Sequence, residues 1–100
     1  MANSVLDSMS SNEPPAGLSP PLEALWWLKK GKLEIGPEWK RAHELCQSGP
    51  RDRASDLVHA LAHWIEGDMS NADYWYRRVG GTRAATLKQE WERIAASLTA

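Results

Sequence analysis

The sequence predicts an all-α protein of five short helices, and three observations support this prediction. Apolar side chains recur at the i, i+3, i+4 and i+7 spacing of a helical face, most clearly at Ala72, Trp75, Tyr76 and Val79. Prolines and glycines stand where helices are expected to begin and end. No segment alternates apolar and polar residues in the way of a half-buried strand.

The composition is that of one small globular domain. Hydrophobic residues make up 42% of the 100 residues and charged residues 25%, a balance typical of a chain with a single core. The formal net charge of −1 argues against a polyanionic partner, so we expect no binding to nucleic acid. The only cysteine, Cys46, cannot form an internal disulfide, which excludes a disulfide-stapled scaffold.

The N-terminal region differs in composition from the rest of the chain. Residues 1–17 are rich in Ser, Asn and Pro and are predicted to be a flexible tail, whereas residues 18–100 are predicted to form a single all-helical domain. The tail lacks the basic and apolar regions of a signal peptide. No apolar run approaches the roughly 18 residues that cross a bilayer. We therefore expect a cytoplasmic protein with no membrane partner.

The first two helices are predicted from their proline starts and glycine ends. Ser19 is the expected N-cap of the first helix, which ends near Gly31, and Pro37 is expected to begin the second. Trp26 and Trp27 are adjacent in the first helix, and a helix turns by about 100° between neighbours. Both indoles therefore cannot point at the same core, and one is expected to be exposed or covered by the tail, the fifth helix or another subunit.

Three further helices are predicted in the second half of the chain. The third runs from about Asp52 to Glu66. Ser70 and Asp73 resemble a capping box for the fourth, which ends at Gly80–Gly81, and Thr86 is the expected cap of the fifth. The apolar stripe of the fifth helix consists of Leu87, Trp91, Ile94, Ala95 and Leu98.

The third and fourth helices resemble the hairpin of a tetratricopeptide repeat. Ala60 and Ala72 are small residues that let two antiparallel helices approach closely, Gly67–Asp68 stands at the turn, and the rings of His63 and Tyr76 fill the gap. The first two helices show a weaker form of this pattern. The resemblance implies two antiparallel tetratricopeptide-like hairpins, with the C-terminal helix as a cap on the stack.

The run HALAHWIEGDMSNADYWYRRVG, from His59 to Gly80, also resembles a motif of a family of small microbial proteins. That family carries the pattern HRREGD-x-x-NA-x-YWFRR-x-G, and the segment from Trp39 to Gln47 is similar to its upstream W-x-x-[AS]-H-x-[IL]-x-Q. The resemblance covers nearly half of the chain and departs from the pattern at Trp64, Ile65 and Val79. It implies tetratricopeptide-like helical hairpins and no particular activity.

A candidate metal site lies on the third predicted helix, where His59, His63 and Glu66 share one face at i, i+4 and i+7. Two imidazoles one turn apart can chelate a transition metal ion, with the carboxylate as a third ligand. Alternatively, the face is a polar surface that bonds to a neighbouring helix, or it supplies a catalytic base. Because it lies opposite the apolar side of the helix, we expect it to point outward.

His43 and Cys46 are i, i+3 neighbours on the second predicted helix. If the second and third helices pack side by side, a zinc site of one cysteine and three histidines is conceivable. In the simpler interpretation, Cys46 is a small core residue on the stripe of Trp39 and Ala42, and His43 lies at its boundary.

Tyr74 and Arg78 are expected to face outward from the fourth helix and to stack, beside an i, i+4 pair of Asp73 and Arg77. An exposed aromatic among arginines is typical of an interaction hot spot. The predicted partner-binding residues are Trp27, His59, His63, Tyr74 and Arg78.

The leading functional prediction is a protein-interaction module or assembly subunit, whose partner is another protein or a second copy of the chain. The alternative is a metal-binding or small hydrolytic protein centred on the face of His59, His63 and Glu66. The sequence contains no phosphate-binding loop, nucleophile elbow or dinucleotide fingerprint. We therefore predict no catalytic residue and no cofactor, and favour a protein without enzymatic activity.

Overall fold

A computed structural model of the chain describes residues 9–49 and 52–99. This part of the chain forms helices and turns without a strand, which confirms the predicted all-α fold. The helices are α1 (Pro20–Lys30), α2 (Pro37–Ser48), α3 (Arg53–Ile65), α4 (Met69–Val79) and α5 (Leu87–Thr99). None of these helices has the length and apolar character needed to cross a membrane. Of the predicted tail, residues 1–8 lie outside the described part, and Met9 packs against the core.

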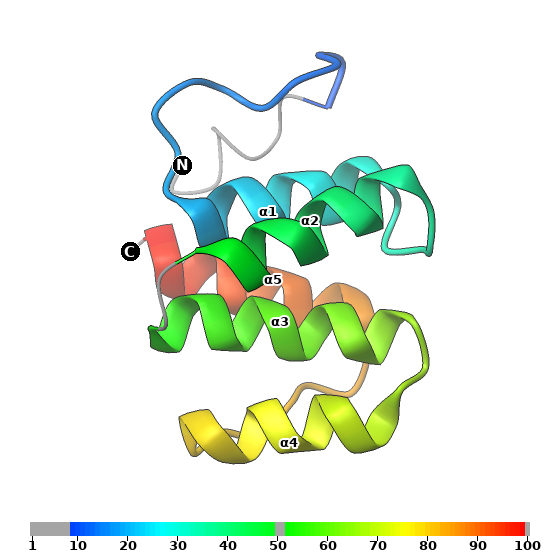
Figure 1. Cartoon of the computed structure of the whole chain (residues 1–100), viewed down its shortest axis with the longest axis vertical. Coiled ribbons are helices and arrows are strands. Elements are labelled where there is room, and N and C mark those ends of the chain that lie inside the picture. The colour runs from blue at the N-terminus through cyan, green and yellow to red at the C-terminus, as the bar shows by residue number, and fades with distance from the viewer. Residues whose placement is uncertain (1–8, 50–51, 100) are drawn as a thin grey trace.

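The helices form two closely packed pairs, α1 with α2 and α3 with α4 (Figure 1). Helix α3 lies at the centre and is the only described helix that packs against all of the other four. Helix α5 packs on α3 and α1. Helix α4 lies at one end of the molecule, and α3 is the only described helix whose backbone lies close to it (Figure 1). The core therefore collects around α3.

The central position of α3 buries nine consecutive residues, Ser55–His63. His59 is 5% exposed and His63 is 6% exposed, so the expectation that their face points outward is wrong. A helix periodicity indicates which residues share a face, but it does not reveal whether another helix covers that face. Here α2 and α4 cover it.

Of the three caps predicted from the sequence, Ser19 stands at the N-cap of α1 without a capping hydrogen bond from its side chain, Thr86 caps α5, and Ser70 does not cap α4. The Asp52 carboxylate accepts a hydrogen bond from the Ser55 amide (2.8 Å), and Thr86 Oγ1 accepts one from the Gln89 amide (3.1 Å). The capping box placed at Ser70 is wrong, because Asp68 is the N-cap of α4. Gly67, with φ of 84°, turns the chain so tightly after α3 that the next helix begins at once.

The turn after α1 contains two consecutive residues in the left-handed region. Gly31 ends the helix as predicted, but φ is positive at the two residues that follow it, 61° at Lys32 and 56° at Leu33. This conformation costs about 1–2 kcal/mol for a residue other than glycine. Glycine is required at position 31 for a different reason, since a Cβ there would lie 2.8 Å from Glu38 Cβ.

A fully buried carboxylate joins α4 to α5. Glu90 accepts hydrogen bonds from the Tyr76 hydroxyl (2.8 Å), the Ala84 amide (2.8 Å) and the Arg93 guanidinium (2.8 and 2.9 Å). Burial by itself would raise the pKa of Glu90, but the hydrogen bonds from Arg93, Ala84 and Tyr76 outweigh it and lower the pKa below its ordinary value. Burial and the bonded Glu90 carboxylate raise the pKa of Tyr76.

Replacement of this carboxylate should destabilise the fold. We expect Glu90→Gln to lower the free energy of unfolding by about 3 kcal/mol, because three donors lose a charged acceptor in the core. Urea unfolding followed by tryptophan fluorescence measures the change. Glu92, an exposed glutamate on the same helix, provides a control, because Glu92→Gln should change the free energy of unfolding by less than about 0.5 kcal/mol. Equal effects of the two substitutions would contradict the role of Glu90.

The same substitution should alter the response to acid. Since the pKa of Glu90 is lower in the folded chain than the value of about 4.3 expected for the unfolded chain, its stabilisation is complete above that pH. It is lost as the pH falls through the lower folded pKa, where the unfolded chain binds the proton more readily. Acid unfolding of Glu90→Gln should therefore show a smaller loss of stability than that of the original chain.

Candidate metal centre

All three histidines of the chain meet between α2 and α3. His43 comes from α2, and His59 and His63 come from successive turns of α3. One ring nitrogen from each lies within 4.8 Å of the other two. His43 Nε2 and His59 Nε2 are 3.2 Å apart and share a hydrogen bond. We call these three residues the histidine cluster.

The rings of the histidine cluster are held in fixed orientations. The imidazoles of His59 and His63 stack, with centroids 4.7 Å apart and planes at 25°, as expected for an i, i+4 pair on one helix. The His43 ring stands on edge to both, at interplanar angles of 71° and 77°. The cluster therefore presents nitrogens from two directions.

Two tryptophans from different helices stack on the cluster. Trp39 stacks on His43 with planes at 10°, and Trp75 of α4 stacks on His59 with centroids 4.3 Å apart. The Trp39 indole Nε1 donates a hydrogen bond to the Ala62 carbonyl (2.8 Å), which fixes α2 against α3. In the sequence, both tryptophans stand on apolar helical stripes, which predicted a packing role only. The sequence signal that could have placed Trp39 beside the cluster is its i, i+4 spacing from His43 on one face of α2.

Access to the cluster is from the side of His43. His59 and His63 are buried, whereas His43 is half-buried. Burial, followed by the charge of the neighbouring His63, lowers the pKa of His43 below its ordinary value, although Glu66 and Glu44 oppose this shift. Neutral His43 is therefore favoured, and the neutral imidazole is the form that binds a metal ion.

Glu66 contacts the cluster through a single histidine. Its carboxylate accepts a hydrogen bond from His63 Nδ1 at 2.6 Å. This bond places the lone pair of His63 on Nε2, the arrangement that orients metal-binding histidines in proteins. Glu66 also groups with His63 and Asp68, but it does not join His59 within 4.8 Å. The structure thus brings together His59 and His63, and it adds not Glu66 but His43, which the alternative site of one cysteine and three histidines had included.

Cys46 lies apart from the histidine cluster. The grouping of ligand atoms within 4.8 Å contains three histidines and no cysteine. Burial, with a smaller contribution from Asp56, raises the pKa of the Cys46 thiol to about 12, so the thiol stays protonated. Its observed role is that of a small core residue, which is the simpler of the two interpretations from the sequence.

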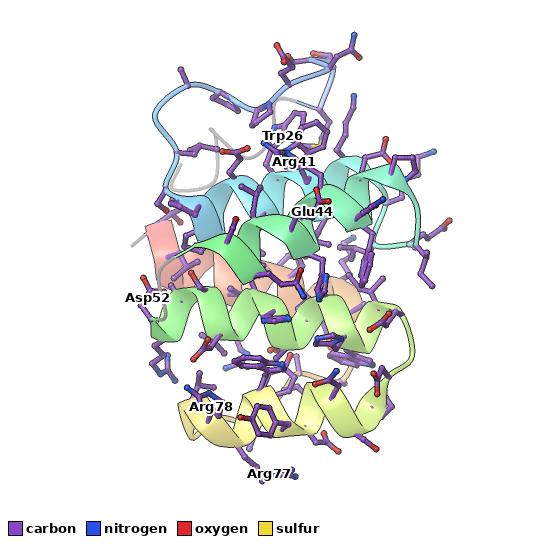
Figure 2. The ribbon with its side chains drawn as sticks, in the orientation of Figure 1. Trp26, Arg41, Glu44, Asp52, Arg77 and Arg78 are labelled. Atoms are coloured by element: carbon purple, nitrogen blue, oxygen red, sulfur yellow. The ribbon has the colours of Figure 1, made fainter. Side chains whose placement is uncertain are left out.

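The predicted partner-binding residues do not form one surface. Tyr74 is 47% exposed on α4, and the guanidinium of Arg78 lies 5.9 Å from its ring. Arg78 faces α3, where it pairs with Asp56 (3.7 Å), while Arg77 points away from the molecule (Figure 2). Trp27 lies on α1, half-buried in a T-shaped contact with Trp26.

The ion pair predicted between Asp73 and Arg77 is replaced by another. Asp73 accepts a hydrogen bond from Arg83 Nη1 at 2.7 Å. The i, i+4 spacing identifies partners only within one helix, whereas Arg83 comes from the segment between α4 and α5.

No family model, curated protein or solved structure matches this chain. The resemblances to tetratricopeptide repeats and to the microbial family therefore stay predictions.

The bond between Trp39 and Ala62 offers a test of the cluster's support. Trp39→Phe keeps an aromatic ring against His43 but leaves the Ala62 carbonyl without its donor, and we expect a loss of about 1 kcal/mol in the free energy of unfolding. Trp27→Phe is the matched control, because Trp27 Nε1 is buried without a partner among the described residues. Urea unfolding of both variants measures the two losses in free energy of unfolding. Equal losses would show that the hydrogen bond from Trp39 to Ala62 does not contribute to stability.

Proposed function

We propose that this protein binds a divalent transition metal ion, with His43, His59 and His63 as its ligands. The observation that carries the proposal is the convergence of three imidazole nitrogens within 4.8 Å, two of them 3.2 Å apart. In a tetrahedral zinc site with Zn–N bonds of about 2.0–2.1 Å, two ligand nitrogens lie about 3.3 Å apart. The separation of His43 and His59 therefore matches one edge of such a site.

The hydrogen bond between His43 and His59 is compatible with this proposal. Two neutral imidazoles can approach to 3.2 Å only if one Nε2 carries a proton and the other accepts it. For both Nε2 atoms to bind a metal ion, the proton of the donor ring moves to its own Nδ1, so each ring binds as a neutral imidazole and no net proton is released. This hydrogen bond satisfies the polar pair, and the spacing of its two nitrogens is that required by the ion.

The donor set favours particular ions. Imidazole nitrogens suit zinc, copper, nickel and iron, whereas calcium and magnesium prefer oxygen ligands. Three protein ligands leave a fourth position for water on the side of His43, which is half-buried. We limit the proposal to ion binding and do not extend it to hydrolysis, because the nearby carboxylate of Glu66 is already bonded to His63.

The position of the cluster suggests what the ion does for the fold. His43 belongs to the pair α1–α2, and His59 and His63 belong to the pair α3–α4. We propose that the two pairs are tetratricopeptide-like hairpins capped by α5, and that the ion fastens one hairpin to the next. Because the ion binds only the folded arrangement, it should stabilise the chain by mass action.

Metal titration tests the proposal. Metal-free protein should bind one equivalent of Zn²⁺, and Co²⁺ should give the visible absorption typical of tetrahedral coordination. A hundredfold excess of free ion over the dissociation constant should add about 2.7 kcal/mol to the stability. Absence of saturable binding by both ions would overturn the proposal.

Matched variants locate the ligands. His43→Ala should weaken zinc binding on the order of 100-fold, and Glu66→Gln should weaken it by about 10–100-fold through loss of the orienting bond. Gln47→Ala, an exposed change on the same helix, and Cys46→Ala should leave the affinity unchanged. An unchanged affinity in His43→Ala would remove the assignment.

A second proposal is that the outer face of α4 binds protein, with a second copy of the chain as the partner. Tyr74 is one of two exposed large apolar side chains among the described residues, the other being Ile35 in the turn between α1 and α2. The Arg78 guanidinium, which also pairs with Asp56 of α3, lies 5.9 Å from the Tyr74 ring, and an exposed aromatic beside an arginine is a combination that interaction hot spots favour.

Sedimentation velocity over a range of concentrations tests this surface. We expect association that Tyr74→Ala weakens by about 30-fold and that Ile35→Ala leaves unchanged, since both remove an exposed apolar side chain but only one lies on α4. A chain that stays monomeric at the highest concentration would contradict the second proposal.

A further inference from the structure

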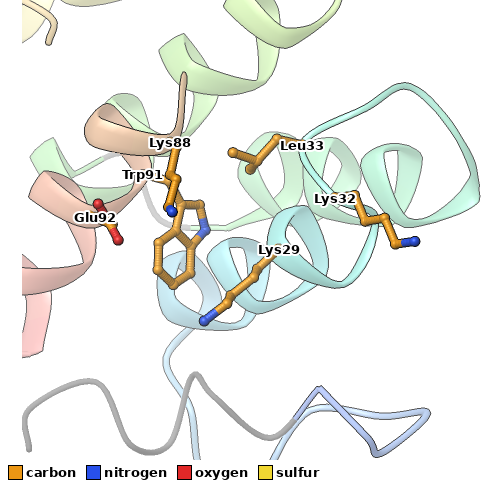
Figure 3. A pocket seen from close by; sticks show the side chains of 6 residues that line it. All are labelled: Lys29, Lys32, Leu33, Lys88, Trp91 and Glu92. Carbon is orange, nitrogen blue, oxygen red and sulfur yellow. The ribbon is translucent and has the colours of Figure 1, made fainter. Parts of the chain in front are cut away.

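A cavity of about 600 Å³ lies on a different part of the molecule from the histidine cluster. It is formed by the end of α1, the turn that follows and the first half of α5 (Figure 3). Its lining residues are Lys29, Lys32, Leu33, Lys88, Trp91 and Glu92. A volume of this size is within the range of sites that hold small molecules.

The cavity is cationic and has a fixed aromatic wall. The described residues that line it include three lysines but only one acidic residue, Glu92. The Trp91 indole Nε1 donates a hydrogen bond to the Leu25 carbonyl (2.8 Å), which fixes the ring, and Lys29 Nζ lies 5.0 Å from the ring centroid. Figure 3 shows Lys29 and Lys88 beside this ring.

Helix stability explains only one of these lysines. Lys29 lies in the last turn of α1, where a cation interacts favourably with the helix dipole. Lys88 lies in the first turn of α5, where a cation is unfavourable. Lys32 and Leu33 hold left-handed backbone conformations that residues other than glycine avoid. Three residues in locally unfavourable settings, Lys88, Lys32 and Leu33, thus border one cavity. Residues of this kind cluster at functional sites, where the site requires them.

We infer that this cavity binds a small organic dianion, a phosphate monoester or a dicarboxylate. Among the described lining residues the lysines outnumber the acids by two, which favours an anion, and lysine ammonium groups donate to phosphate and carboxylate oxygens. Lys29 and Lys88 lie beside the Trp91 ring, whereas the Lys32 side chain extends away from it (Figure 3). The apolar surfaces of Leu33 and Trp91 provide a wall for the carbon skeleton of the ligand.

Calorimetric titration of the full chain with three probes tests the inference. Ribose 5-phosphate, succinate and uncharged ribose are added to metal-free protein that has been dialysed free of chelator, since chelators are themselves polyanions. Saturable binding of ribose 5-phosphate or of succinate, with none of ribose, supports the site and identifies the phosphate or the dicarboxylate as its ligand. Absence of binding by both anions at about 10 mM, far above the concentrations at which typical sites fill, overturns it.

Lysine variants decide whether the anion occupies this cavity. Lys88→Ala and Lys32→Gly should each weaken binding about tenfold, whereas Lys40→Ala, an exposed lysine of α2 outside the cavity, should not. Lys32→Gly also relieves the left-handed conformation, so its melting temperature should not fall, and weaker binding cannot be ascribed to unfolding. Equal affinities in Lys88→Ala, Lys40→Ala and the original chain would overturn the inference.

Discussion

The burial of α3 on every side is the constraint on which the rest of the structure depends. Because α3 packs against all of the other described helices, its buried histidines cannot rely on bulk water, although Ser55 Oγ is buried with no partner among the described residues. His59 finds its partner on α2 in His43, and His63 finds its partner in Glu66 beyond the end of the same helix. The histidine cluster follows from the need to satisfy imidazoles within a buried helix.

Buried polar groups are also paired within the protein on the other side of the core. Glu90 is fully buried and is satisfied by Tyr76 of α4, by a backbone amide and by Arg93 of its own helix. The indoles of Trp39 and Trp91 each donate to the carbonyl of a residue in another helix. Polar atoms in this core therefore connect different helices at defined points, which apolar packing alone does not do. A small chain with no disulfide gains a specific arrangement of its helices in this way.

The two candidate ligand sites occupy different helices and rest on different chemistry. The histidine cluster uses α2 and α3 and offers imidazole nitrogens, whereas the cationic cavity uses α1 and α5 and offers ammonium groups. The cluster lies against Trp39 and Trp75, and the cavity lies against Trp91, which belongs to the hydrophobic core. The sites can therefore be altered separately, and the metal ion and the anion need not compete.

The sequence by itself determined the helices, because proline, glycine and capping residues act within a few neighbours: Pro20, Pro37, Asp52 and Thr86 begin helices where local rules place them. It also determined that His59 and His63 share a face. Only the tertiary structure decided that this face is covered, that His43 and not Glu66 completes the cluster, and that three lysines border one cavity. Those relations join residues on separate helices, and helical periodicity carries no information about which faces meet.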